Sequence, residues 1–534
     1  MAQIKYRANL SASGYPLAMS RSAGSVIIPG PDQNYDRRVD PTGETSPPGI
    51  PQAIYLENVL PTAEGYRSVG YQTMAPLPWT GSTCLVEVRS TKSNTSELLA
   101  LRAGAQQAVR WNGIAWENVG ITGGTGAPNF SDTASVAVLK GKIILFDGDN
   151  IWQYNLSGTS YPFSGVLQRL DGITSTTGTF LPAGVLTNLK SITASYGYLL
   201  LLKDTGLETQ LLWSSLLTET DFQPSLVTGS GGGAIADCQG RAITVRPSDT
   251  GFYLYSTNNV VVATYTGNSR YPFRFKPVKD SGGVVSAEQI HSDVDESTQY
   301  YLTRYGSVTA IQQDMSQQLA PEFADFMEKT RAVDVYNSAT KTFGLAYLPS
   351  VYGYPAICYV YANRYLCVSV IHTEILGGGV QPYNCIYIYD MVLRRYGRLV
   401  ADHTHVMSLH TSVREDSIGL LNARTGQLRR VVFDESGSGV MLLGRFQYAR
   451  SRKLILDELK VSKVLAGGLT VTYLPSENSL DFLTPETPYY DAVNSTAGAK
   501  KYLSMIEGTS VSILLEGAFD LSLAELTFHL GGDS

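Results

Sequence analysis

The chain has 534 residues, of which 43% are hydrophobic but only 16% are charged, against roughly 25% in an average soluble domain. This length allows two or three domains with a sizeable core, and the surface must be covered largely by uncharged polar residues and Tyr, as in many all-β proteins. The formal net charge of −6 argues against a free-standing nucleic-acid-binding protein, which would usually carry a basic balance or patch.

The cysteines and the N-terminal sequence indicate where the protein is made. Five widely spaced cysteines without a CxxC pair predict reduced, mostly buried thiols: Cys84, Cys238, Cys358, Cys367 and Cys385. The sequence MAQIKYRANL lacks the apolar core of a secretory signal, and no apolar run is long enough for a membrane span. We therefore expect synthesis and folding in the cytoplasm.

Residues 1–80 predict an extended N-terminal arm with an entry turn. Residues 1–50 are rich in Gly, Pro, Ser and Asp and have no helical or two-residue period, which is typical of a segment that is disordered alone or lies on a neighbour. The stretch IYLENVLPTAEGYRSVGY follows at residues 54–71, and its Pro61 and Gly65 mark a fixed turn.

Residues 81–435 predict an irregular β-propeller of about six blades. Short apolar runs separated by Gly, Asn and Asp turns recur roughly every 45 to 60 residues, the size of a four-stranded blade with its loops. The runs are at residues 135–156, 191–216, 242–265, 291–311, 332–348 with 385–400, and 417–433. Two consecutive β-sandwiches would show a similar pattern and remain an alternative.

Two further elements complete the expected all-β fold. The sequence QDMSQQLAPEFADFMEKT (313–330) predicts one helix with Leu319, Phe323 and Phe326 on one face, and Pro321 must lie in its first turn or split it. Alternating strands over residues 436–534 predict a small C-terminal domain that resembles a β-sandwich.

None of the candidate chemical motifs has enough residues to predict a catalytic, cofactor or metal site. His403 and His405 would share a strand face near His410, but no third metal ligand follows at a telling spacing. The sequence DGDN (147–150) predicts a hairpin turn, since the rest of a calcium loop is missing. The sequence GSGGGA (229–234) predicts a flexible loop, because no Lys-Ser/Thr or helix follows it. We expect the basic, aromatic stretches 270–277 and 444–453 to be solvated strand edges.

The order of these segments resembles the tail hub or nozzle proteins of short-tailed bacteriophages (podoviruses), also called packaged-DNA stabilisation proteins. A similar string opens the ordered part of the chain in that family, and the matching residues here are Asn58, Leu60, Pro61, Thr62, Gly65, Tyr66, Arg67 and Gly70. LLWSSLLTETDFQPS (211–225) is similar to a second feature of the family, a strand that ends in Trp-Ser (Trp213 and Ser214) before a turn between blades. Tyr396 stands where Trp is frequent in the family.

The resemblance implies a structural virion protein of the viral tail, without enzymatic activity or cofactors. It implies a homo-hexameric ring below the portal and adaptor proteins and above tail needle, fibre or spike proteins, with transient contact to the host envelope. Viral DNA would be retained behind the ring and then pass through its lumen without sequence-specific binding, which suits an acidic protein. The turn at Pro61 and Gly65 would let the arm reach an adjacent subunit.

Two other functions remain open. A carbohydrate-binding or receptor-binding propeller (an adhesin) would need aromatic residues at equivalent positions in each blade, whereas all five tryptophans lie in the first 213 residues. A propeller glycosidase would need a cluster of carboxylates.

Overall fold

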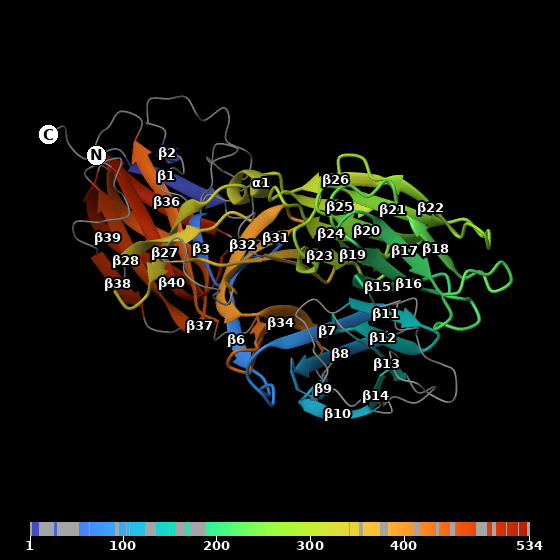
Figure 1. Cartoon of the computed structure of the whole chain (residues 1–534). Helices are drawn as coiled ribbons and strands as arrows, with labels where there is room; N and C mark the ends of the chain where they lie inside the picture. The colour runs from blue at the N-terminus through green and yellow to red at the C-terminus, as the bar shows by residue number, and fades with distance from the viewer. Residues whose placement is uncertain are drawn as a thin grey trace.

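The computed structural model describes most of the chain between the two termini. The described residues are 3–9, 26–28, 53–63, 65–90, 95–102, 104–105, 107–122, 135–148, 150–155, 166–169, 187–340, 342–351, 356–373, 383–410, 416–433, 437–448, 454–476, 489–493, 498–508, 510–521 and 523–530. They form an all-β protein in which a ring of small sheets lies beside a larger sheet assembly (Figure 1).

Seven four-stranded antiparallel units form the blades of a β-propeller, which confirms the predicted fold. Four of these blades are separate sheets, whereas blades 1 and 2 join into one eight-stranded sheet and blade 6 is continuous with the larger sheet assembly. Blade 1 contains β7 (Thr83–Ser90), β8 (Thr95–Arg102), β9 (Ala108–Trp111) and β10 (Trp116–Thr122). Blade 2 contains β11 (Ser135–Leu139), β12 (Lys142–Phe146), β13 (Ile151–Asn155) and β14 (Val166–Arg169). Blade 3 contains β15 (Leu189–Ser195), β16 (Tyr198–Asp204), β17 (Thr209–Trp213) and β18 (Gly231–Ala234). Blades 4 and 5 are built from β19 (Ala242–Pro247), β20 (Gly251–Ser256), β21 (Val260–Tyr265), β22 (Phe273–Pro277); and β23 (Ile290–Ser292), β24 (Gln299–Leu302), β25 (Val308–Gln312), β26 (Met315–Leu319). Blades 6 and 7 are built from β29 (Ile357–Tyr361), β30 (Tyr365–Val370), β31 (Tyr383–Asp390), β32 (Arg395–His403); and β33 (His405–Leu409), β34 (Ser417–Asn422), β35 (Gln427–Val432), β6 (Gly70–Thr73).

The ring of seven blades closes at blade 7. The chain enters through β6, which pairs with β35 as the outermost strand of blade 7, so strands from both ends of the propeller sequence complete one blade. The six apolar runs found in the sequence correspond to blades 2 to 7, and the meander of blade 1, residues 83–122, was not counted among them.

An apolar cluster fills each space between adjacent blades, and the cluster between blades 5 and 6 continues into the core of the sheet assembly. Strand β16 shows the principle, because Leu199 and Leu201 pack towards blade 2 while Leu200 and Leu202 pack towards blade 4. A strand that is buried on both faces needs a continuous apolar run instead of an alternating one, and the run YLLLL at residues 198–202 is such a sequence. Each such leucine contributes about 1.5–3 kcal/mol by its burial.

The sheet assembly beside the propeller contains strands from both ends of the chain. Its strands are β36 (Gly439–Tyr448), β37 (Leu454–Ser476), β38 (Tyr489–Val493), β39 (Gly498–Gly508), β40 (Ser510–Leu521) and β41 (Leu523–Leu530), joined by β1 (Gln3–Asn9), β2 (Val26–Ile28) and β3 (Ala53–Glu57). The sequence led us to expect an N-terminal arm that reaches another subunit. In the structure the strands of this segment pair within their own chain, since β1 pairs with β41 and both β2 and β3 pair with β36.

One insertion between blades 5 and 6 links the propeller to this sheet assembly (Figure 1). It contains α1 (Glu322–Met327) and the hairpin of β27 (Arg331–Asn337) and β28 (Thr342–Leu348). The single 3-10 turn of the described residues, η3 (Ala287–Gln289), lies directly before blade 5. Phe323 of α1, Val333 of β27, Val368 of blade 6 and Leu514 of β40 belong to one apolar cluster. The predicted helix is confirmed in a shorter form, since Pro321 precedes its first residue and residues 315–319 form strand β26.

Candidate functional sites

The joint segment, residues 53–73, connects the propeller to the sheet assembly through four short strands. They are β3, β4 (Val59–Pro61), β5 (Tyr66–Ser68) and β6. Strands β3 and β5 pair with β36 and β40 of the sheet assembly, whereas β4 and β6 pair with β32 and β35 of blades 6 and 7. Successive strands therefore alternate between the two parts of the molecule.

Asn58 makes the bend between β3 and β4. Its φ of 52° is in the left-handed region, where Asn is one of the few residues other than Gly that is tolerated. Its side-chain oxygen accepts hydrogen bonds from the Tyr71 hydroxyl (2.6 Å) and from the backbone N–H of Val400 in blade 6 (2.9 Å). One amide thus fixes the bend and ties it to the propeller.

The predicted turn at Pro61 and Gly65 is closed by short hydrogen bonds and held by an arginine. The N–H of Thr62 donates to the carbonyl of Gly65 (2.9 Å), and the N–H of Gly65 donates to the Thr62 hydroxyl (3.2 Å). Arg395 of β32, which is almost fully buried, donates to the Thr62 carbonyl (3.0 Å). Blade 6 therefore supplies the cation that caps this turn, which sequence analysis did not identify.

The apolar residues of the joint segment divide between the two parts of the molecule. Leu60 is fully buried in the cluster between blades 6 and 7. Tyr66 points the other way and is buried in the cluster that contains the core of the sheet assembly.

Arg67 and Ser68 connect β5 to the sheet assembly. Arg67 donates to the carbonyl of Phe433 (2.9 Å) and lies 4.0 Å from the carboxylate of Asp520. The buried Ser68 hydroxyl accepts from the N–H of Phe519 (2.9 Å) and donates to the carbonyl of Gly437 (3.1 Å). Ser68 was missed in the sequence, although its position two residues after Tyr66 on the same strand face would have indicated burial.

Arg398 is a buried charge at the centre of the same region. It lies on β32 opposite Val59 of β4, with its guanidinium 5.0 Å from the centre of the Tyr55 ring. Its Nε donates to the Cys385 thiol (3.3 Å). All five cysteines are free and only Cys238 is partly exposed, which confirms the predicted reduced, mostly buried thiols.

Trp213 and Ser214 anchor the blade 3 loop, residues 214–230, which connects β17 to β18. The Trp213 indole donates to the carbonyl of Gly229 (2.9 Å), and the buried Ser214 hydroxyl accepts from the N–H of Leu199 (2.9 Å). A Cβ atom at Gly231 would lie 3.0 Å from the Trp213 ring, so any larger residue there would have to displace the ring slightly. The prediction of a flexible loop over residues 229–234 is therefore wrong for Gly231–Ala234, which form the edge strand β18.

The blade 3 loop exposes four apolar side chains. Leu217, Leu226 and Val227 are 77%, 69% and 93% exposed, and Leu216 is also exposed. The N–H of Leu216 donates to the carbonyl of Thr228 (3.2 Å), which ties the two sides of the loop together. The loop is held in place from blade 2 by Lys140, which donates to the Leu216 carbonyl (2.7 Å). A fixed loop with this exposed face is suited to contact with another macromolecule.

The remaining sequence candidates are structural. Both ring nitrogens of His403 have hydrogen-bond partners, the Ala401 carbonyl at 2.7 Å and the Ser369 hydroxyl at 2.8 Å. Burial lowers the pKa of His403 and of His405 to about 4. The two lie on different strands, β32 and β33, contrary to the shared face expected. The predicted DGDN turn is confirmed, since Asp147 accepts from the N–H of Asn150 (2.6 Å) and from the Trp152 indole (2.7 Å).

The described residues contain neither a metal-binding cluster nor a membrane-spanning helix. No group of three or more His, Cys, Asp or Glu side chains among them is placed to hold a metal ion. No helix in the same part of the chain is long and apolar enough to cross a membrane.

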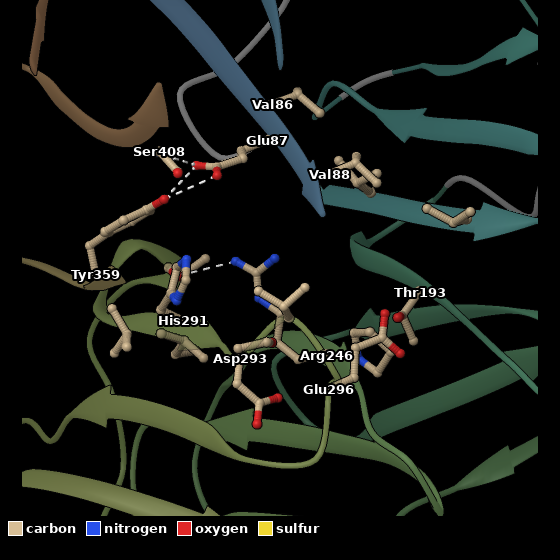
Figure 2. A pocket seen from close by; sticks show the side chains of 18 of the residues that line it. Val86, Glu87, Val88, Thr193, Arg246, His291, Asp293, Glu296, Tyr359 and Ser408 are labelled. Atoms are coloured by element: carbon tan, nitrogen blue, oxygen red, sulfur yellow. Dashed lines mark hydrogen bonds between the residues drawn. The ribbon is translucent and has the colours of Figure 1, made fainter. Parts of the chain in front are cut away.

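A central cavity of about 770 Å³ is lined by residues of the innermost strands of all seven blades. Figure 2 shows part of this lining. On one side, Glu87 of blade 1 accepts from the Tyr359 hydroxyl (2.9 Å) and from the N–H of Ser408 (3.3 Å), and Tyr359 packs against His291 with ring centres 4.2 Å apart. Sequence analysis missed this cavity, because its lining comes from seven separate stretches that become neighbours only when the ring closes.

The fold of this chain is similar to that of known β-propellers among solved structures. No protein-family model and no curated protein matches the chain. Among solved structures, it is similar to the β-propeller domain of Myceliophteria thermophila Cps50 (Swd1), with 8% identity, a TM-score of 0.36, and coverage of 68% of this chain and 99% of that one. It is also similar to YCF48 from Cyanidioschyzon merolae, with 12% identity, a TM-score of 0.34, and coverage of 67% and 98%. The propeller assignment rests on the strand pairings of this chain.

Proposed function

We propose that this protein is a structural component of a short-tailed phage virion, a tail hub or nozzle without catalytic activity. Copies of the chain assemble into a ring below the portal and adaptor and above the needle, fibre or spike proteins. The ring retains packaged DNA and then conducts it during ejection. The sequence resemblance of residues 58–70 and 211–225 to that family suggests the proposal.

The observation that supports it best is the exposed face of the blade 3 loop. Leu217, Leu226 and Val227 cost free energy while they remain in water, at roughly 25 cal/mol per Å² of apolar surface. The loop is anchored by Trp213 and Ser214, two residues of the resemblance, so it presents these side chains in a fixed arrangement. We assign the face to a second copy of this chain, since a head-to-tail ring brings one patch of each copy against a different patch of the next.

In this proposal DNA passes through the hole at the centre of the ring of subunits. The cavity inside one propeller is not that passage, because its 770 Å³ is surrounded by side chains of all seven blades. The net charge of −6 suits a conduit, since a basic lumen would hold the phosphates of the DNA.

The test is the mass and symmetry of the full chain, measured by native mass spectrometry and negative-stain class averages. We expect a six-fold ring with a central hole, either for the chain alone or after addition of portal and adaptor. The double variant Leu217→Ser/Val227→Ser should stay monomeric. Val392→Ser, at a residue 69% exposed in a turn of blade 6, is the matched control and should assemble normally.

Two results would overturn the proposal. One is a wild-type chain that stays monomeric in the presence of portal and adaptor. The other is a double variant that forms rings as readily as the wild type, which would remove the blade 3 loop from the interface.

A further inference from the structure

The central cavity has an ordered distribution of charge from its interior to its mouth. Tyr196, Asn363 and Asp416 are exposed lining residues that follow the ends of the inner strands β15, β29 and β33, so the mouth lies at that end of the blades. Asp249 and Glu296 follow the ends of β19 and β23 and lie at the same end. The mouth is therefore acidic.

Arg246 is the arginine that lines the interior of this cavity. It lies on the inner strand β19, and its guanidinium points into the cavity (Figure 2). Its one hydrogen bond within the described part of the chain goes from Nη2 to the carbonyl of Ala287 (3.3 Å), and its Nε is buried without a hydrogen-bond partner. No described carboxylate lies within salt-bridge distance of it, and burial lowers the pKa of the guanidinium.

Asp249, at the mouth of the cavity, also has a polar atom for which the described part of the chain provides no hydrogen-bond partner. Its Oδ1 is buried and has no hydrogen-bond partner among the described residues. Other carboxylates of the cavity are already satisfied, since Glu87 accepts from Tyr359 and Asp293 accepts from the Ser297 hydroxyl (2.7 Å). Arg246 and Asp249 are partly buried as whole side chains, but one polar atom of each, Nε and Oδ1, is buried without a partner in the part of the protein that the structure describes. Buried polar atoms normally have hydrogen-bond partners, so these two atoms in one cavity indicate where polar groups of a bound molecule would be held.

The chemistry of the walls narrows the class of ligand. Arg246 offers cationic donors that suit an anionic acceptor, and planar carboxylates match the donor geometry of a guanidinium. The acidic mouth would repel a ligand that carries only negative charge and attract an ammonium group. Val88, Val136 and Val138 line another side of the cavity, where a short alkyl chain can pack. A volume of about 770 Å³ is in the range of small-molecule sites.

We propose that the central cavity binds a small zwitterion, with its carboxylate on Arg246 and its ammonium group near Asp249 at the mouth. The site is independent of the assembly role, because the ligand contacts only the inner strands of one propeller and the turns that follow them. Failure of ring formation and failure of ligand binding are therefore separate results.

The test is isothermal titration calorimetry on the full chain with a series of unbranched ω-amino acids from glycine to aminooctanoate. The alkanoate and the alkylamine of each length serve as half-ligands. We expect at least one amino acid of the series to bind more tightly than both of its half-ligands. Arg246→Met should weaken that binding about 10- to 100-fold, the loss expected for one charged hydrogen-bonding partner.

Two further variants assign the two ends of the ligand. Asp249→Asn should remove the preference for the amino acid over the alkanoate without weakening alkanoate binding. Arg274→Met, at an exposed arginine of the outer strand β22, is the control and should bind as the wild type does. If Arg246→Met does not fold, Arg246→Lys, which keeps the charge but loses the planar donor pair, should fold and bind more weakly than the wild type.

The inference is overturned if no member of the series binds to the wild-type chain. It is also overturned if the half-ligands bind as tightly as the amino acids, or if the Arg246 variants bind with unchanged affinity. Binding of a neutral sugar in the cavity with the same affinity in the Arg246 and Asp249 variants, and no binding of the amino acids, would also overturn it.

Discussion

The joint segment and the blade 3 loop carry the same sequence resemblance, but their side chains have opposite environments. In the joint segment, Leu60 and Tyr66 are buried in two different clusters, and Asn58 bonds to blade 6 of its own chain. In the blade 3 loop, Trp213 and Ser214 are anchors, and the residues they position are exposed. The comparison shows that residues 58–70 hold the two parts of the chain together, whereas Trp213 and Ser214 position a surface.

The largest expected effect comes from the joint segment. Tyr66→Ala removes a fully buried ring between the propeller and the sheet assembly and should lower the free energy of unfolding by about 3–5 kcal/mol. Urea unfolding followed by tryptophan fluorescence reports on the propeller, because all five tryptophans lie in or beside blades 1 to 3. A shift of the urea midpoint is the safer measure, since a protein with two parts need not unfold in one step.

Tyr66→Phe is the control, because it keeps the ring and changes only the hydroxyl. If Tyr66→Ala unfolds at the same urea concentration as the wild type, the joint segment does not couple the two parts of the molecule as described.

A smaller effect is expected where the joint segment uses a single hydroxyl. Ser68→Ala leaves the N–H of Phe519 and the carbonyl of Gly437 without that partner in a buried place, which should cost about 1–3 kcal/mol. Thr73→Ala, at an exposed position on β6, should change stability little and gives the baseline. Equal urea midpoints for the two variants would mean that water replaces the Ser68 hydroxyl at no cost.

The propeller could be predicted from the sequence because its signals are local. Turn residues such as those of DGDN and apolar runs such as residues 198–202 determine hairpins and doubly buried strands within a few residues. The helix boundary at Pro321 was equally local, because proline has no N–H for the preceding turn.

The closure of the ring and the joint could not be predicted in this way. Strand β6 pairs with β35, and Arg395 caps a turn more than three hundred residues away in the chain, so no local period records either contact. Gly231–Ala234 were misjudged for a related reason. Four small residues have low strand propensity, and the ring of Trp213, which decides their structure, packs against them only in the folded sheet.

The smallest expected change in stability comes from the blade 3 loop, and it completes the comparison. Leu217→Ser/Val227→Ser alters side chains that are already in water, so the urea midpoint should correspond to a change within about 0.5 kcal/mol of the wild type. The same double variant is expected to lose ring formation, whereas Tyr66→Ala is expected to lose stability first. A large loss of stability in the double variant would mean that these side chains pack within their own chain. In that case the exposed face, and not only its partner, would have to be reassigned.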